Sequence, residues 1–166
     1  EPAMTQFQDL RTREPNSASA YQGIGHVFLL QGKLREAEEA LTKAVALDPS
    51  SWLSHNLLGL AYDQGQHHGE AITAYKKALA LRPREPGVLN NLGLAYALSG
   101  DHDAAIQAYE QAVAAGSDSP KLHNNLGVAY GAGKGVAEDA AKAVSLFRQS
   151  CDGGDALGCR NLGNMY

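Results

Sequence analysis

The sequence lacks the features that would assign it to several large classes of protein. It has no run of about 18 apolar residues, so direct membrane insertion is not expected. Lysine and arginine number 14 against 18 aspartates and glutamates, and this balance lacks the basic excess of most nucleic-acid-binding proteins. Valine and isoleucine are few and do not alternate with polar residues, so no sheet is predicted. The sequence therefore predicts a helical protein whose partner is neither a membrane nor a nucleic acid.

A recurring sequence pattern is the main feature that the chain does contain. The pattern is Leu-Gly-x-x-Tyr, usually with asparagine just before it, and the first copy is a degenerate one, Ile-Gly-x-x-Phe. The glycines of successive copies lie 34, 34, 34 and 36 residues apart. They are Gly25, Gly59, Gly93, Gly127 and Gly163. A fixed period of this length indicates stacked helical repeats.

Helix-breaking residues predict where each helix ends. In the first complete repeat, one helix is predicted over 18–31 and ends at Gly32, and a second over 34–47 ends at Asp48-Pro49. Residues 65–69 and 99–101 are predicted turns between the two helices of later repeats. Residues 3–13 align with residues 37–47 of the next repeat after a shift of 34 residues, so they are predicted to be the second helix of an incomplete repeat. The end of the chain is also predicted to fall within a helix. We therefore expect about nine helices, cut from a longer array.

Small residues recur where the two helices of a pair must approach closely. The repeated glycines fall within the first helix of each pair, where each costs about 1 kcal/mol relative to alanine. Because glycine recurs at the same position of each repeat despite its low helix propensity, we expect the two helices to pack closely there. Large side chains are expected to fill the gaps between successive pairs, because no single pair can bury its apolar side alone. These side chains are Leu41, Tyr62, Tyr75, Tyr96, Tyr109 and Tyr130.

This combination resembles the tetratricopeptide repeat (TPR). In residues 52–85, Leu-Gly-x-x-Tyr is followed by Glu-Ala-Ile-x-x-Tyr-x-x-Ala-Leu-x-Leu-x-Pro, close to the family pattern. The resemblance implies an all-α fold, a right-handed α-solenoid of antiparallel helix pairs. It divides one continuous domain into a half repeat at 1–17, TPRs at 18–51, 52–85 and 86–119, a fourth repeat at 120–155 and a half repeat at 156–166.

The fourth repeat departs from the TPR pattern. Gly127 and Ala143 are 16 residues apart, whereas Gly93 and Ala105 are 12 residues apart, so the turn has four extra residues. The turn, 131–139, contains Gly-x-Gly-Val, and Lys-Ala opens the following helix. These features resemble the Sel-one-like repeat, a relative of the TPR. The array is therefore expected to be mixed, with a Sel-one-like repeat at 120–155.

Cys151 and Cys159 are the only two cysteines. They are predicted to lie at the end of one helix and the start of the next, side by side across a short turn. A disulfide, whose Cα atoms are typically about 5.5 Å apart, is compatible with this placement, and two reduced thiols are the alternative. The spacing resembles that of cysteine-rich Sel-one-like repeats, which implies a disulfide and export to the periplasm or surface of a bacterium. Reduced thiols would instead favour the cytoplasm.

No group of residues predicts catalysis. His67 and His68 could chelate a metal, but solvated histidines in a turn are the preferred interpretation. The other histidines occupy different positions in the repeat, and no Ser/His/Asp arrangement is brought together by spacing. Residues 131–135, with Lys134, lack the spacing and the preceding strand of a phosphate-binding loop. We expect no enzyme activity, no metal site and no cofactor.

The concave face is the surface expected to carry function. The TPR resemblance assigns it to certain positions on the first helix of each pair. Asparagine amides at these positions offer one acceptor and two donors to the main chain of an extended peptide, and aliphatic residues between them would form apolar pockets. The predicted peptide-binding residues are Asn56, Leu60, Asp63, Asn90, Asn91, Leu94, Asn124, Asn125 and Val128. In the alternative interpretation, the asparagines hold each first helix to its neighbour.

The resemblance implies a non-catalytic scaffold that binds a protein or peptide partner along this face. One alternative is a structural spacer or self-association module, with homo-oligomers forming through the exposed ends of the solenoid. Another is a regulatory segment of a larger enzyme whose catalytic domain lies outside these residues. Residues 1–10 are polar and do not resemble a signal peptide.

Overall fold

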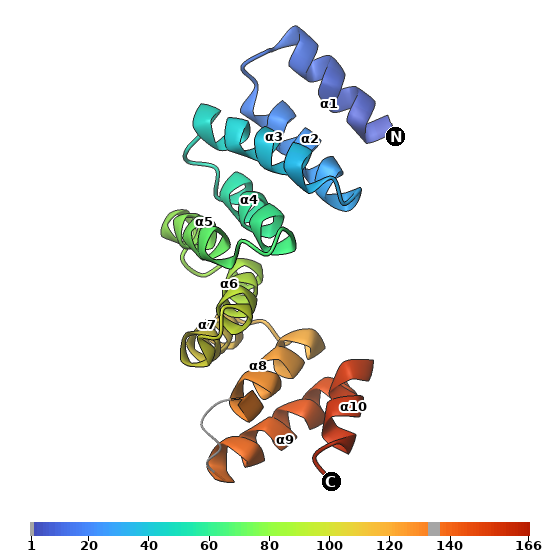
Figure 1. Ribbon diagram of the computed structural model, residues 1–166, viewed down its shortest axis with the longest axis vertical. Helices are drawn as coiled ribbons and strands as arrows, with labels where there is room; N and C mark the ends of the chain where they lie inside the picture. The colour runs from blue at the N-terminus through green and yellow to red at the C-terminus, as the bar shows by residue number, and fades with distance from the viewer. Residues whose placement is uncertain (1, 133–136) are drawn as a thin grey trace. The chain divides into compact units, whose positions relative to one another are not determined.

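The computed structural model describes residues 2–132 and 137–166, and these residues form ten helices (Figure 1). The chain divides into two compact units, residues 1–83 and 84–166. The first unit contains α1 (Pro2–Arg13), α2 (Ala18–Leu30), α3 (Leu34–Leu47), α4 (Trp52–Gln64) and α5 (His68–Leu81). The second contains α6 (Pro86–Leu98), α7 (His102–Ala114), α8 (Pro120–Ala132), α9 (Ala137–Asp152) and α10 (Ala156–Gly163).

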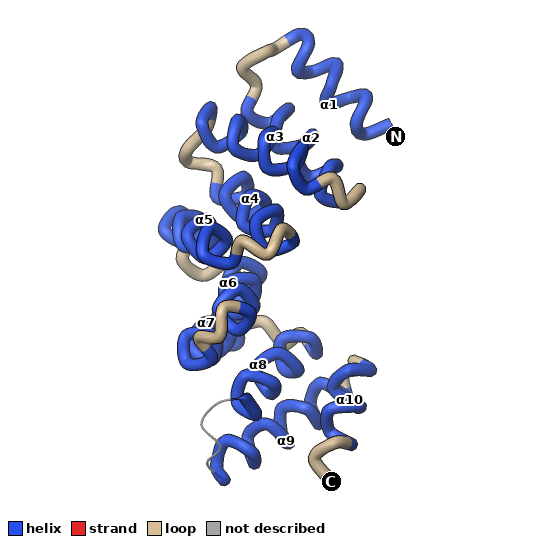
Figure 2. The backbone as a smooth tube through the Cα atoms, in the orientation of Figure 1, coloured by secondary structure: helices blue, strands red, loops and turns tan. Residues whose placement is uncertain are grey.

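The all-α class of antiparallel helix pairs, of the TPR solenoid type, is confirmed. Four pairs, α2/α3, α4/α5, α6/α7 and α8/α9, stand between two single helices, so the expected count of nine was one too low. Short loops connect the helices, and no described residue is in a β-strand (Figure 2). Within the described ranges, no helix is long and apolar enough to cross a membrane.

Caps and left-handed glycines set the helix ends. The side chains of Ser17, Ser51 and Asp101 each accept a hydrogen bond from a main-chain N–H in the first turn of the following helix. Gly32 and Gly100 adopt φ values of 70° and 87°, which glycine reaches without steric cost. The predicted turn at 65–69 is too long, because α5 already begins at His68. The predicted glycine-rich turn at 131–139 lies partly outside the described residues, which omit 133–136.

Four of the repeated glycines, Gly25, Gly59, Gly93 and Gly127, each lie against one large side chain from the second helix of their own pair. A Cβ atom added at Gly59 or Gly93 would clash with the ring of Tyr75 or Tyr109, and Gly127 lies in the same way against Phe147. Tyr75 and Tyr109 thus fill the space that the glycine leaves within their own pair, a contact that the sequence did not predict, because only a residue without a side chain allows an aromatic ring to approach the helix main chain. Leu41 contacts Gly25 in the same way, and it also belongs to a buried cluster with Leu57 and Leu58 of the next pair, as predicted.

The tyrosine three residues after the glycine is the side chain that bridges pairs. In the second unit, the Tyr130 hydroxyl of α8 donates a 2.6 Å hydrogen bond to Glu110 of the preceding α7. In the first unit, Tyr62 packs against the buried core that includes Leu29, Leu41 and Leu57. This part of the packing prediction agrees with the structure.

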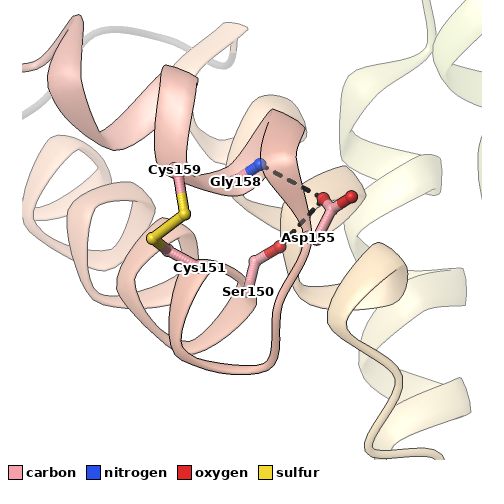
Figure 3. The surroundings of a disulfide bond; sticks show 5 residues. All are labelled: Ser150, Cys151, Asp155, Gly158 and Cys159. Carbon is pink, nitrogen blue, oxygen red and sulfur yellow. Dashed lines mark hydrogen bonds between the residues drawn. A yellow bond between two sulfur atoms is a disulfide. The ribbon is translucent and has the colours of Figure 1, made fainter.

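A disulfide bond between Cys151 and Cys159 joins α9 to α10 (Figure 3). Their Cα atoms are 4.4 Å apart. Beside the bond, the Asp155 carboxylate accepts 3.1 Å hydrogen bonds from the buried Ser150 hydroxyl of α9 and from the Gly158 N–H of α10. Asp155 is thus the N-cap of α10 and also holds this helix to α9.

Candidate functional site

Exposed aliphatic side chains in the second unit surround a hydrogen-bonded pair of asparagines. Asn125 Nδ2 of α8 donates to Asn90 Oδ1 of α6 at 3.4 Å, which brings the two helices together at these residues. Leu94 and Leu98 of α6 and Val128 of α8 are 39%, 54% and 46% exposed. Helical spacing places Leu94 and Leu98 in line with Asn90, and Val128 in line with Asn125. We call this surface, formed by Asn90, Leu94, Leu98, Asn125 and Val128, the α6/α8 face.

The asparagines also join α8 to α10. Asn161 Nδ2 of α10 donates to Asn124 Oδ1 of α8 at 2.9 Å. Asn124 is only 7% exposed. The structure thus supports the alternative interpretation, in which asparagines link neighbouring first helices, because both bonds repeat the same geometry one period apart. Peptide binding by Asn90, Asn91, Asn124 and Asn125 stays a prediction.

The first unit uses a glutamine at the corresponding position. Gln22 Oε1 of α2 accepts hydrogen bonds from the hydroxyls of Ser51, just before α4, and Ser54, at 3.2 and 2.9 Å. Asn56 and Leu60 of α4 are half-buried. The link between first helices is therefore present in both units, although its residue types differ.

Asp63, predicted to contact a peptide, bonds instead to the second helix of its pair. One carboxylate oxygen accepts from the Tyr75 hydroxyl at 3.0 Å, and the other lies 3.0 Å from His68 Nδ1. The Asp63 side chain is 10% exposed. Burial, with Asp63 as a further cause, raises the pKa of Tyr75 far above its ordinary value. The Asp63 carboxylate thus links α4 to α5 through these contacts, and its role as a peptide contact stays a prediction.

The first helices of the pairs carry almost no charge. Neither α2 nor α6 contains a charged residue; α4 contains only Asp63, and α8 only Lys121. The second helices hold many more charges, as in α3, which contains Arg35, Glu36, Glu38, Glu39 and Lys43. Charge is thus divided between the two sides of each unit, and the α6/α8 face lies on the uncharged side.

Pockets on the side of the second helices were not anticipated from the sequence. One, of about 480 Å³, lies between α7, α8 and α9, and another, of about 320 Å³, lies between α3, α4 and α5. Their lining residues correspond by position in the repeat: Val113, Leu126, Tyr130 and Leu146 match Val45, Leu58, Tyr62 and Ala74. The repeat period could have predicted that these residues occupy equivalent positions. It could not have predicted that they surround a pocket.

Three polar side chains that line the pocket between α7, α8 and α9 contact one another. Tyr130 donates to Glu110, and the Lys142 ammonium lies 5.2 Å from the centre of the Tyr130 ring. The pocket therefore presents mainly its aliphatic wall to a ligand, and it contains none of the predicted peptide-binding residues.

The histidines show no arrangement for metal binding or catalysis. His68, predicted as a loop residue, is the first residue of α5 and pairs with Asp63. His55 Nε2 bonds to the Pro49 carbonyl oxygen at 3.1 Å. In the part of the chain that the structure describes, no three His, Cys, Asp or Glu side chains come together as metal ligands. His68 and His55 thus have local, structural partners.

Comparison with known families gives one consistent result. The tetratricopeptide repeat model matches four overlapping stretches, residues 3–51, 23–86, 56–120 and 90–154. The last match extends through most of the repeat predicted to be Sel-one-like, and no comparison supports that assignment. No curated protein sequence gives a significant match.

Solved structures show the same fold. MamA is 26% identical over 90% of this chain and 85% of its own, with a TM-score of 0.80. The pilF protein of Pseudomonas aeruginosa is 25% identical over 89% of this chain and 67% of its own, with a TM-score of 0.77. YrrB, described as a TPR protein with an unusual peptide-binding site, is 18% identical over 95% of this chain and 80% of its own, with a TM-score of 0.77. At that identity, the likeness to YrrB concerns the fold alone.

Proposed function

The chain belongs to the tetratricopeptide repeat family, and from this premise we propose that it is a non-catalytic scaffold that binds a peptide or partner segment on the α6/α8 face. Proteins of this family typically bind other proteins. The observation that carries the proposal is the group of Leu94, Leu98 and Val128, each more than a third exposed, beside the Asn90–Asn125 pair. Exposed aliphatic side chains gathered on one face are typical of interaction surfaces.

The aliphatic residues and the asparagines have complementary roles in this proposal. Burying an aliphatic side chain under a partner contributes about 25 cal/mol for each Å² removed from water, so the three side chains supply affinity. The amides supply directional hydrogen bonds that position the partner. The Asn90–Asn125 and Asn124–Asn161 bonds hold the helices in place before binding, which lowers the entropy that binding must overcome.

Selection of peptides from a phage-displayed random dodecapeptide library tests this proposal. Enriched peptides are then compared on the Leu94→Asp variant and on a matched control, Val113→Asp, since Val113 of α7 is also 39% exposed. We expect Leu94→Asp to weaken binding at least tenfold and Val113→Asp to leave it unchanged, with both variants retaining the helical circular dichroism of the wild type. The proposal fails if no peptide is enriched over a protein-free support, or if the enriched peptides depend on Val113 rather than Leu94.

Two finer assignments accompany this proposal. A Sel-one-like character of residues 120–155 and an oxidising bacterial compartment stay predictions, supported by the four-residue longer turn and by the Cys151–Cys159 pair. Thiol titration of protein isolated without reductant tests the second assignment. Two titratable thiols per chain would remove the argument for export.

A further inference from the structure

We infer that a pocket between α2 and α3 binds a methylated ammonium group, such as that of choline or of a trimethylated lysine side chain. The pocket has a volume of about 330 Å³, which is within the range of small-ligand sites, roughly 300 to 1,000 Å³. It shares no residue with the α6/α8 face, so the inference is independent of the proposed function. The residues that line it are Tyr21, Ile24, Phe28, Glu36, Glu39 and Ala40.

Two aromatic rings of α2 line this pocket. Tyr21 and Phe28 are both half-buried. They are seven residues apart, so they lie on the same side of α2, about 10 Å apart along its axis, with Ile24 between them. Ile24 and Ala40 are only 3% and 9% exposed, and they supply aliphatic surface beside the rings. A cation is attracted to the face of an aromatic ring, and methyl groups on its nitrogen suit an aliphatic surface because they need no hydrogen bonds.

Two carboxylates of α3 supply the opposite charge. Glu36 and Glu39 are three residues apart, so they lie on the same side of the helix, and both are exposed. Arg35 Nη2 lies 3.9 Å from the Glu39 carboxylate, but water screens this exposed pair. Because the carboxylates keep their contact with water, they attract a cation without the free-energy cost of burial. The residues that line the pocket therefore favour an organic cation over an anion.

The equivalent pocket of the second unit contains an ammonium group from the chain itself. Tyr130 there corresponds to Phe28, and Lys142 corresponds to Glu36 when the four extra residues of the fourth repeat are counted. The Lys142 ammonium lies 5.2 Å from the centre of the Tyr130 ring. The fold thus holds a cation beside the ring at this repeat position, and the α2/α3 pocket has an acid where that lysine would be. The ligand occupies the place that the Lys142 ammonium takes in the second unit.

Lys33, just before α3, is the nearest competitor for the Phe28 ring. Its ammonium lies 5.8 Å from the centre of the ring, and it is not among the residues that line the pocket. Lys33 is exposed, and a lysine ammonium is strongly hydrated. A methylated ammonium loses less hydration when it approaches the rings, so it is the better ligand for them.

Titration with choline and with its neutral isostere tests the inference. 3,3-Dimethylbutan-1-ol has the shape of choline, with carbon in place of the charged nitrogen. We expect choline to cause saturable NMR shifts at the amides of Ile24 and Ala40, with a dissociation constant lower than that of the alcohol by about fivefold or more. Equal binding of the two compounds, or choline shifts that do not saturate, would overturn the inference.

Two pairs of variants locate the contact. Glu36→Lys gives the pocket the lysine of the second unit and is expected to weaken choline binding by about tenfold or more. Glu38→Lys makes the same change in net charge on α3 at a residue that does not line the pocket, and its effect should be about twofold or less.

Phe28→Leu should weaken binding by about fivefold, whereas Tyr62→Leu, the same change at the equivalent position of the next pair, should leave it unchanged. Circular dichroism should show wild-type helicity for every variant. Equal effects of Glu36→Lys and Glu38→Lys would contradict the site even where Phe28→Leu fails to fold.

A short peptide with trimethyllysine at its centre distinguishes the two sources of the ligand. It is titrated beside choline and beside the same peptide with unmodified lysine. Tighter binding of the trimethyllysine peptide than of choline assigns the site to a modified protein, and weaker binding assigns it to a free small cation. Tighter binding of the unmodified peptide than of its trimethylated form, with choline no better than its isostere, would show that the pocket does not recognise a methylated ammonium.

Discussion

The two helices of each pair in the second unit differ in composition and in role. The first helices, α6 and α8, contain the glycines and the asparagines, one charge between them, and three of the exposed aliphatic residues. The second helices, α7 and α9, supply the aromatic rings that fill the glycine positions, Tyr109 and Phe147, and more of the charged groups. The second helices therefore carry most of the charged side chains that water solvates. The first helices are left nearly uncharged, which suits contact with an apolar partner.

The first unit shows the same division with one exception. Its first helices contain a single acid, Asp63, and that acid is bonded to Tyr75 and His68 of the second helix. The Asp63 carboxylate thus contacts the second helix of its own pair. Four substitutions test how the first and second helices depend on one another.

The largest effect is expected where the first helix meets the ring of the second. Gly93→Val places side-chain atoms in the space of the Tyr109 ring, which is 1% exposed and has no room to move. We expect the free energy of unfolding to fall by about 3 kcal/mol or more. Urea denaturation measures this value.

The matched control is Gly131→Ala near the end of α8, where an added Cβ meets nothing within 4 Å. This change is expected to leave the unfolding free energy unchanged or to raise it by up to about 1 kcal/mol. Similar losses for the two variants would show that the contact with the Tyr109 ring is not what makes Gly93 intolerant of a side chain.

Removal of the disulfide is expected to loosen α10 alone. The bond closes a loop with a sequence separation of 8, and Cys159→Ser should destabilise the attachment of α10 by about 2–3 kcal/mol. Hydrogen exchange should accelerate in α10 and remain unchanged in α6. Reductant should have the same effect on the wild type and none on the variant. Unchanged exchange in α10 would show that the Asp155 and Asn161 hydrogen bonds hold the helix without the disulfide.

Conversion of Asp63 to alanine makes the α4/α5 pair resemble α6/α7, where Ala97 occupies the equivalent position. The Tyr75 hydroxyl then loses its acceptor while its ring stays buried, which is expected to cost about 2 kcal/mol of unfolding free energy. The double variant Asp63→Ala/Tyr75→Phe should recover part of this loss, because it also removes the stranded hydroxyl. No recovery would indicate that His68 is the more important partner of Asp63.

The smallest effect is expected from the reverse change, Ala97→Asp. His102 occupies the position equivalent to His68, and its Nδ1 is buried with no hydrogen-bond partner among the described residues. An aspartate at 97 would supply that partner, and we expect the unfolding free energy to rise by about 1 kcal/mol. The gain should vanish in Ala97→Asp/His102→Ala. A loss of stability would mean that burial of the new carboxylate outweighs its hydrogen bond.

Much of the fold was predictable because residues one repeat period apart occupy equivalent positions in successive helix pairs. The spacing of Gly59 and Gly93 gave the helix pairs, and Gly32 and Pro49 gave helix ends within about a residue. The period could not show which large residue faces each glycine. Tyr62 and Tyr75 are both aromatic and both regularly spaced, and only the three-dimensional packing places one between pairs and the other within a pair.

The repeat phase predicts which first-helix positions are candidate binding residues, but not which of them already have hydrogen-bond partners. The repeat phase placed Leu94 and Val128 correctly as exposed residues of first helices. The same phase could not show that Asn124 is buried against α10, or that Asp63 bonds to α5. Each of these side chains has a partner 12 to 37 residues away, and a donor or acceptor in the sequence does not reveal whether the fold has already paired it.

The dependence of binding on ionic strength tests most directly whether the first-helix side is an uncharged binding surface. The dissociation constant of the most enriched peptide is measured by calorimetry on the wild type at 50 and 500 mM NaCl, concentrations that change the screening length from roughly 14 to roughly 4 Å. Lys121 is the only charge on α6 and α8, and one exposed ion pair contributes at most about 1 kcal/mol, so the constant should rise by less than about fivefold. A rise of twentyfold or more would show that the partner is held by the charged second helices and would contradict the account.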